Sequence, residues 1–181
     1  LKQLEKQHGN SVQWTVGPDQ NTVLSWEQIC DSFDADYYML AGDEVTFETP
    51  GWDKKFDETK QKYPDGIFCM SMYCGRGQSR LNENVTPVVT KQWRQALGYF
   101  WGPMFWHWNV DQWSGDLAKA VDRFEYRKDI TVRIKKIKKD PTGLRNRSAG
   151  IFNRDEWTYK KCKEIYFPGD VEKLRRALKQ S

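Results

Sequence analysis

The sequence predicts an α/β fold, with a mixed sheet flanked by helices. Short apolar runs of strand length recur along the chain, stretches with apolar residues at helical spacing separate them, and Gly- or Pro-containing turns divide the two. With 181 residues, of which 38% are hydrophobic and 30% charged, the chain is long enough for one domain with a real core. No run approaches the ~18 apolar residues of a membrane span, and residues 1–11 are too polar for a secretory signal.

The N-terminal elements are short. Residues 1–8 are typical of a helix end, closed by Gly9-Asn10, and residues 12–16 alternate like a strand that ends at the Gly17-Pro18 turn. Further strands are expected at 37–40, 45–47, 67–73, 88–89 and 130–137, and helices at 25–33, 51–63, 91–97, 111–120, 155–165 and 170–179.

Two strands and one loop carry specific expectations. Residues 37–40 and 67–73 are near-continuous apolar runs, which are typical of strands buried on both faces. Residues 130–137 alternate and therefore predict a strand with one face in water. Residues 138–150 have the composition of a flexible loop. We expect one domain over 1–181, with a core at 12–134 and a basic loop and C-terminal helices at 135–181.

Aromatic residues are abundant, with nine Trp, eight Tyr and nine Phe. Their flat faces suit sugars or bases, and the alternative is a Trp-rich core with a few exposed rings. The four cysteines form no Cys-x-x-Cys pair and the chain has two His, which favours free thiols in a reducing compartment over a zinc site. The basic tract from Arg123 to Arg147 indicates contact with phosphates, or a solvated strand and loop.

Two acids, Asp43 and Glu44, follow the apolar run at 37–40. Ligands of open α/β sheets gather at the carboxyl ends of strands. Carboxylates there suit Mg²⁺ or Mn²⁺, which combine one or two protein acids with substrate phosphates. The alternative is a pair of solvated turn residues.

A second candidate lies in the aromatic segment 105–121, where Asp111 precedes a predicted helix. Its ordinary role there would be an N-cap. The functional interpretation makes Asp111 a general base among rings that bind a sugar acceptor, with His107 as the other candidate base.

These motifs together resemble the GT-A nucleotide-sugar-dependent glycosyltransferases, closest to the compact phage and bacterial relatives of the family-two enzymes. The resemblance covers residues 12–134. Its most specific part is the acidic pair followed by the turn Thr49-Pro50-Gly51-Trp52-Asp53. The segments KQWRQALGYF and HWNVDQWSGDLA are similar to the acceptor side of that family. The implied fold is a Rossmann-like mixed sheet that lacks the first strand, because eleven residues precede residue 12.

The resemblance implies roles for individual residues. Asp43 and Glu44 would bind Mn²⁺ or Mg²⁺, and Asp111 would be the catalytic base. The donor side would contain Gly17, Pro18 and Gly42, and the acceptor side Trp52, Asp53, His107 and Trp108. The late strand carries Ile134 where relatives often have a His ligand, and Lys135, Lys136, Lys138 and Lys139 are candidates for the missing diphosphate contact.

The implied reaction is an inverting, metal-dependent transfer from a nucleotide sugar, with a UDP-sugar expected, in the cytoplasm (of the host cell if the chain is phage-encoded). The acceptor is a glycan, a protein or a modified base in phage DNA. A partner chain or a missing N-terminal segment would complete the donor site. Two alternatives stay open: a non-catalytic nucleic-acid-binding module, and a degenerate glycosyltransferase subunit.

Overall fold

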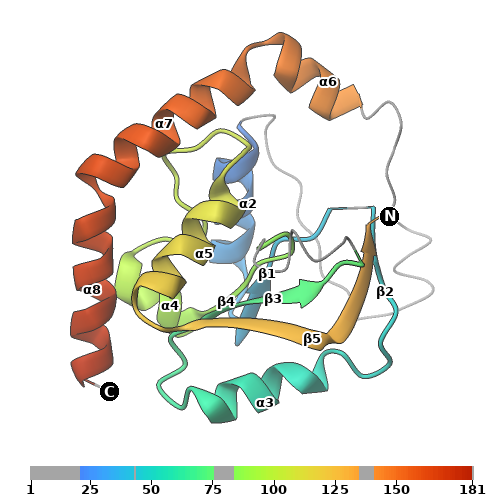
Figure 1. Ribbon diagram of the computed structural model, residues 1–181, viewed down its shortest axis with the longest axis vertical. Helices are drawn as coiled ribbons and strands as arrows, with labels where there is room; N and C mark the ends of the chain where they lie inside the picture. Colours follow the sequence, from blue (N-terminus) through green and yellow to red (C-terminus); the bar gives the residue numbers. More distant parts are fainter. Residues whose placement is uncertain (1–20, 43, 76–83, 135–140, 181) are drawn as a thin grey trace.

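The computed structural model describes residues 21–42, 44–75, 84–134 and 141–180, which form a five-stranded mixed sheet with helices on both faces (Figure 1). The strands are β1 (Tyr37–Met39), β2 (Val45–Phe47), β3 (Cys69–Tyr73), β4 (Val88–Thr90) and β5 (Phe124–Ile134). The helices are α2 (Thr22–Ser32), α3 (Lys54–Lys62), α4 (Lys91–Leu97), α5 (Val110–Ala120), α6 (Pro141–Ser148), α7 (Ile151–Ile165) and α8 (Phe167–Gln180). The predicted α/β class with a mixed sheet is confirmed.

The strand order is β1-β4-β3-β5-β2. Strands β1 and β3 are both antiparallel to β4, β3 and β5 are parallel, and β2 is antiparallel to β5. Residues 128–130 bulge out of β5, since Met72 faces Arg127 and Tyr73 faces Thr131. Within the described sheet β1 is an edge strand, and Tyr38 is the one buried residue of its three. The expectation that β1 is buried on both faces is therefore wrong, whereas β3 is buried along nearly its whole length.

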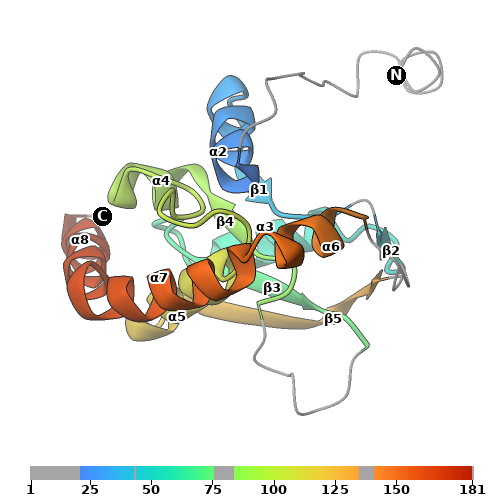
Figure 2. The ribbon, with the colours of Figure 1, turned by 90° about the horizontal axis from the view of Figure 1, so that it is seen from above.

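One face of the sheet, the α5 face, is covered by α2, α4 and α5, with α7 and α8 outside them (Figures 1 and 2). Its core contains Trp93, Trp101 and Trp113, each at most 1% exposed. Part of the aromatic excess is thus ordinary core, as the structural alternative for these rings predicts. Other rings stay partly open, and Trp157 on α7 is 64% exposed.

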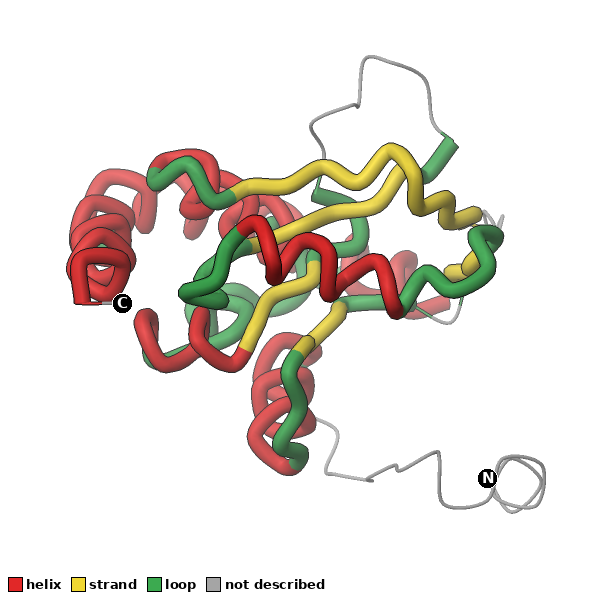
Figure 3. The backbone as a smooth tube through the Cα atoms, turned by 90° about the horizontal axis from the view of Figure 1, so that it is seen from below, coloured by secondary structure: helices red, strands yellow, loops and turns green. Residues whose placement is uncertain are grey.

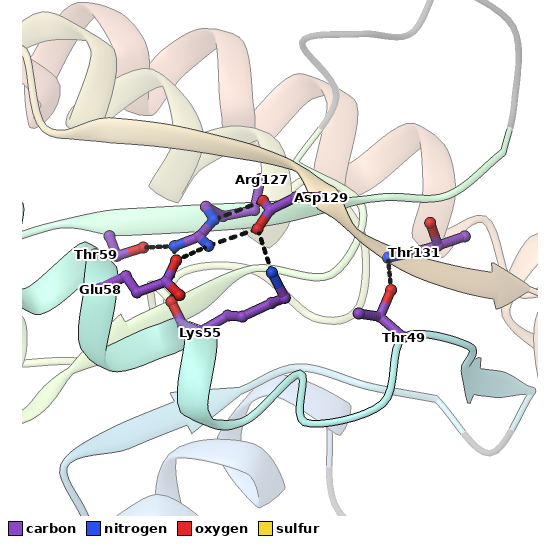
Figure 4. Close-up of polar contacts among 7 residues, drawn as sticks. All are labelled: Thr49, Lys55, Glu58, Thr59, Arg127, Asp129 and Thr131. Carbon is purple, nitrogen blue, oxygen red and sulfur yellow. Dashed lines mark hydrogen bonds and ion pairs between the residues drawn. The ribbon is translucent and has the colours of Figure 1, made fainter.

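The opposite face, the α3 face, carries a smaller core under helix α3 (Figure 3). Alternate residues of β3 divide between the faces, with Cys69 in the α5-face core and Met70 in the α3-face core. Arg127 of β5 ties α3 to the sheet through Glu58, Thr59 and Asp129 (Figure 4). Because its charge is satisfied inside this network, a nearly buried arginine is tolerated in the middle of a strand.

Helices α6, α7 and α8 form an arc along one side of the molecule (Figures 1 and 2). Tyr99 joins the arc to α5, since its hydroxyl donates to Asp170 on α8 at 2.6 Å and accepts from the Trp113 indole at 2.9 Å. The expectation of a loop over 138–150 is wrong for its described part, because Pro141 opens a helix that packs on α7. Helices α7 and α8 also begin earlier than predicted, and Pro168 lies in the first turn of α8, where it costs no hydrogen bond.

The other expected elements within the described residues are confirmed to within a few residues, except that α3 begins at Lys54 and β5 begins six residues early, at Phe124. Gly98 ends α4 in the left-handed conformation that a helix cap of this kind needs (φ 90°). The helix and strand expected before residue 17 lie outside the described residues.

Candidate functional site

The aromatic segment between α4 and α5 is fixed by two carboxylates. Glu27 of α2 accepts hydrogen bonds from the main-chain N–H groups of Phe100 and Trp101. Burial raises the pKa of Glu27 even though these N–H groups lower it. Helix α2 therefore holds the first half of this segment.

Asp155 of α7 holds the second half. It is fully buried, and its two oxygens accept from three consecutive main-chain N–H groups, those of Trp106 (3.0 Å), His107 (2.8 Å) and Trp108 (2.8 Å). A buried carboxylate is stable when its lone pairs are taken up by such donors. Residues 106–108 are therefore fixed in one main-chain path, and we call them the clamped loop.

Asp111 lies one short step after the clamped loop, in the first turn of α5. Asn109, with φ 67°, is the N-cap residue, so the N-cap alternative for Asp111 is wrong. The Asn109 side chain donates to Glu156 at 3.1 Å, which ties the start of α5 to α7. The Asp111 carboxylate is half-buried and accepts from the Gln112 N–H at 2.9 Å. An acid in this position is also favoured by the helix dipole.

Buried Asn84 holds the main chain at Asp111. Its side-chain amide donates to the Asp111 carbonyl (2.9 Å) and to Ser114 (3.1 Å) and lies 3.3 Å from the Cys69 sulfur. It fits because residue 115 is Gly, where an added Cβ would lie 3.1 Å from the Asn84 Cβ. Burial raises the pKa of the Cys69 thiol to about 12, so this thiol is a neutral packing group.

The exit of β1 is linked to the start of α5 through segment 84–87. Leu40, just after β1, donates its N–H to the Pro87 carbonyl at 3.0 Å, and Asn84, three residues before Pro87, contacts Asp111. The two ends of segment 84–87 are thus attached to the exit of β1 and to the entrance of α5. Gly42 and Glu44 lie between β1 and β2, which are the two terminal strands of the described sheet.

Glu44 is half-buried, and its carboxylate folds back over Gly42. A Cβ added at Gly42 would lie 2.8 Å from Glu44 Oε1, so the glycine makes the room that the carboxylate occupies. The Glu44 carboxylate therefore lies against the main chain of Gly42. Asp43 itself, like Gly17 and Pro18, lies outside the described residues. Among the residues that are described, no group of three His, Cys, Asp or Glu side chains is close enough to bind a metal.

His107 and Trp108 are beside Asp111 in the chain and lie on the α5 face. The His107 Nδ1 is 3.1 Å from the Thr22 hydroxyl, and its ring packs against Trp26 and edge-on to Trp108. Trp108 also meets Phe152 of α7 edge-on, at 5.5 Å between centroids. His107 and the partly exposed indoles of Trp26 and Trp108 therefore lie near the start of α5.

Trp52 and Asp53 do not join this group, because they lie on the α3 face. Trp52 stacks on Phe47 at 4.0 Å between centroids and meets Phe56 edge-on. Asp53 is the N-cap residue of α3 without a side-chain capping bond. The structure thus separates the two expected acceptor-binding pairs and gives Trp52 the role of an anchor for α3.

The described arginines of the basic tract contact different partners. Arg123 pairs with Asp65, Arg127 is used inside the α3 network, and Arg133 pairs with Glu48. Lys135, Lys136, Lys138 and Lys139 lie outside the described residues. Asp155, Asn84 and Glu27 carry no sequence signal for their roles, because their partners are 15 to 74 residues away in the chain.

No family model matches the chain, and no curated protein and no solved structure matches it either. None of the described helices is both long enough and apolar enough to cross a bilayer.

Proposed function

We propose that the chain is a GT-A-type glycosyltransferase domain that transfers a sugar from a nucleotide-sugar donor, expected to be a UDP-sugar, to a hydroxyl acceptor. The observation that carries the proposal is segment 84–87, which links the exit of β1, just before the two acids, to the first turn of α5. A single displacement needs a donor site and a base that are positioned relative to each other, and a common support of this kind favours it.

Asp111 is the proposed base. Its carboxylate takes the proton of the acceptor hydroxyl while that oxygen attacks the anomeric carbon, and the bond from this carbon to the diphosphate breaks. One in-line displacement inverts the anomeric configuration. The clamped loop holds the start of α5 in place, so the carboxylate is positioned before the acceptor arrives.

Asp43 and Glu44 would hold Mn²⁺ or Mg²⁺, which when bound neutralises charge on the departing diphosphate. The position of Glu44 over Gly42 supports this assignment. His107 and Trp108 form the acceptor side, whereas Gly42, Gly17 and Pro18 belong to the donor side.

The test is a screen of nucleotide-sugar hydrolysis and transfer with and without Mn²⁺. Asp111→Asn should lower transfer by at least about a hundredfold, the usual contribution of a general base. Asp43→Ala should abolish the Mn²⁺ stimulation. Asp122→Asn is the matched control, because Asp122 is exposed at the other end of α5 and its left-handed backbone (φ 55°) suits Asn. Full activity of Asp111→Asn and Asp43→Ala would refute the proposal.

A non-catalytic nucleic-acid-binding module is the second candidate, favoured by the many Lys and Arg residues of α6, α7 and α8. Thermal stabilisation by UDP with Mn²⁺ separates the two, since the transferase should show it and the module should not.

A further inference from the structure

Two arginines of the arc rest on the rings of the clamped loop. The Arg147 guanidinium carbon lies 5.6 Å from the Trp108 ring centroid and 5.3 Å from that of Phe152. The Arg154 carbon lies 4.5 Å from the Trp106 ring centroid. Both arginines are exposed to solvent. Each one places its positive charge on a ring of the clamped loop, Arg147 from α6 and Arg154 from α7, beside the start of α5.

These guanidinium groups are ordered without an acidic partner. Within the described part of the chain, neither Arg147 nor Arg154 forms a salt bridge. Most of the other described arginines pair with acids: Arg94, Arg123, Arg127, Arg133 and Arg176. Stacking uses the face of a guanidinium and leaves its in-plane N–H donors available.

The platform under the arginines is rigid. Asp155 fixes the main chain of Trp106 and Trp108, so both rings are held before any ligand binds. Neither acid of α7 in this region is directed at the arginines by its described bonds: Asp155 is buried and bound to N–H groups, and Glu156 accepts from Asn109. Pre-positioned donors bind an anion with less loss of side-chain entropy.

We propose that Arg147 and Arg154 form an anion-binding site that recognises a phosphate group of the acceptor, and this rests on the proposed transferase function. Arginine forks match phosphate oxygens in pairs. Base stacking is the weaker alternative, because Arg154 already covers Trp106, and Arg147, His107 and Phe152 already contact Trp108. The site takes a phosphate carried by a sugar or by a nucleic acid strand, and Asp111 follows the clamped loop under the arginines by three residues.

The first experiment measures binding of inorganic phosphate and of a ten-residue oligothymidylate to the full chain by calorimetry, with no nucleotide sugar present. Arg147→Gln and Arg154→Gln should each weaken phosphate binding at least about fivefold, with Arg147→Lys intermediate because it keeps the charge but not the fork. The control is Arg145→Gln, since Arg145 is exposed on the same helix without a ring beneath it. Thermal unfolding of each variant verifies that it folds.

The two ligands, inorganic phosphate and oligothymidylate, distinguish the possible sources of the phosphate. Oligothymidylate binding that depends on Arg147 but not on Arg145 assigns a nucleic acid acceptor, and phosphate binding alone with this dependence assigns a small phosphorylated acceptor. Absence of binding, or equal losses in Arg145→Gln and Arg147→Gln, overturns the site. Donor hydrolysis is measured separately. If hydrolysis is intact while phosphate binding is absent, only the anion site is refuted. If hydrolysis is absent while phosphate binding depends on Arg147, only the transferase proposal is refuted.

Discussion

Asp155→Asn should destabilise the protein strongly, although the change replaces one oxygen by an NH₂ group of nearly equal size. Asp155 is fully buried and accepts three main-chain N–H bonds through two oxygens. An Asn oxygen in the place of Oδ2 keeps two of these bonds, and the NH₂ group then faces the Trp106 N–H, donor against donor. The side chain thus loses one bond and the charge that strengthens the others.

The magnitude follows from these losses. A buried donor left without an acceptor costs about 1–3 kcal/mol, and bonds to a charged acceptor are about twice as strong as neutral ones. Less burial of charge offsets part of this loss, so we expect Asp155→Asn to lower the free energy of unfolding by about 2–4 kcal/mol. Asp155→Ala, which loses all three bonds, should cost more.

Urea unfolding followed by circular dichroism measures the effect, with Glu164→Gln as the control in the same helix. Glu164 is exposed and pairs with Lys161 at 3.4 Å, so its change should stay within about 0.5 kcal/mol. Amide hydrogen exchange at residues 106–108 should become faster in Asp155→Asn. A change in unfolding free energy below about 0.5 kcal/mol, with exchange unaltered, would refute the role assigned to Asp155.

Three other predictions concern single groups. Burial raises the pKa of the Cys69 thiol to about 12, so mass-spectrometric mapping at pH 8 should find Cys69 alkylated in urea and protected in the native state; equal rates would contradict this. Arg127, with Lys55, holds the pKa of Asp129 well below its usual value, so its stabilisation is present above about pH 4 and is lost on further acidification; Asp129→Asn should flatten the stability curve there, and an unchanged acid limb would count against it. Gly42→Ala should displace the Glu44 carboxylate and weaken Mn²⁺ binding, measured by electron paramagnetic resonance, without lowering the thermal midpoint; undiminished affinity would separate Glu44 from the metal.

The sequence predicts elements well where one local signal decides them. Helix α4 spans the expected residues 91–97, between the Thr90 cap and the left-handed Gly98, and the apolar run of β3 is buried. The early start of β5 does have a local signal, because Phe124 to Arg127 alternate rings with charges in the period of a half-buried strand, but the charged pair Lys128 and Asp129 interrupts it. Arg127 is accommodated there by acceptors of α3 that lie 68 to 72 residues away. Helix α6 has weak apolar character, and its packing on α7 forms it where composition indicates a loop.

The candidate site can be predicted from the sequence in part, for the same reason. Asp111 and Glu44 lie at element boundaries, and such positions can be located from local patterns. The link between the exit of β1 and the start of α5 depends on the contacts of segment 84–87, and the clamp on residues 106–108 depends on a helix almost fifty residues later. Trp52 shows the opposite case, since a turn motif places it correctly in the chain while only the fold shows that its ring faces α3.

The two candidate functions make opposite demands on the Asp111 carboxylate. In a transferase this carboxylate accepts a proton, so the charge is needed even though it repels an anionic acceptor bound at Arg147. In a module that only binds phosphate the same charge weakens binding and has no compensating use. Removing it in Asp111→Asn should therefore leave oligothymidylate affinity unchanged or higher, while sugar transfer is lost if the chain is an enzyme. Because the substitution is nearly isosteric and the Gln112 N–H keeps an oxygen acceptor, it changes charge at constant shape. A loss of both binding and transfer would indicate that Asp111 is structural, and neither function could then be assigned to it.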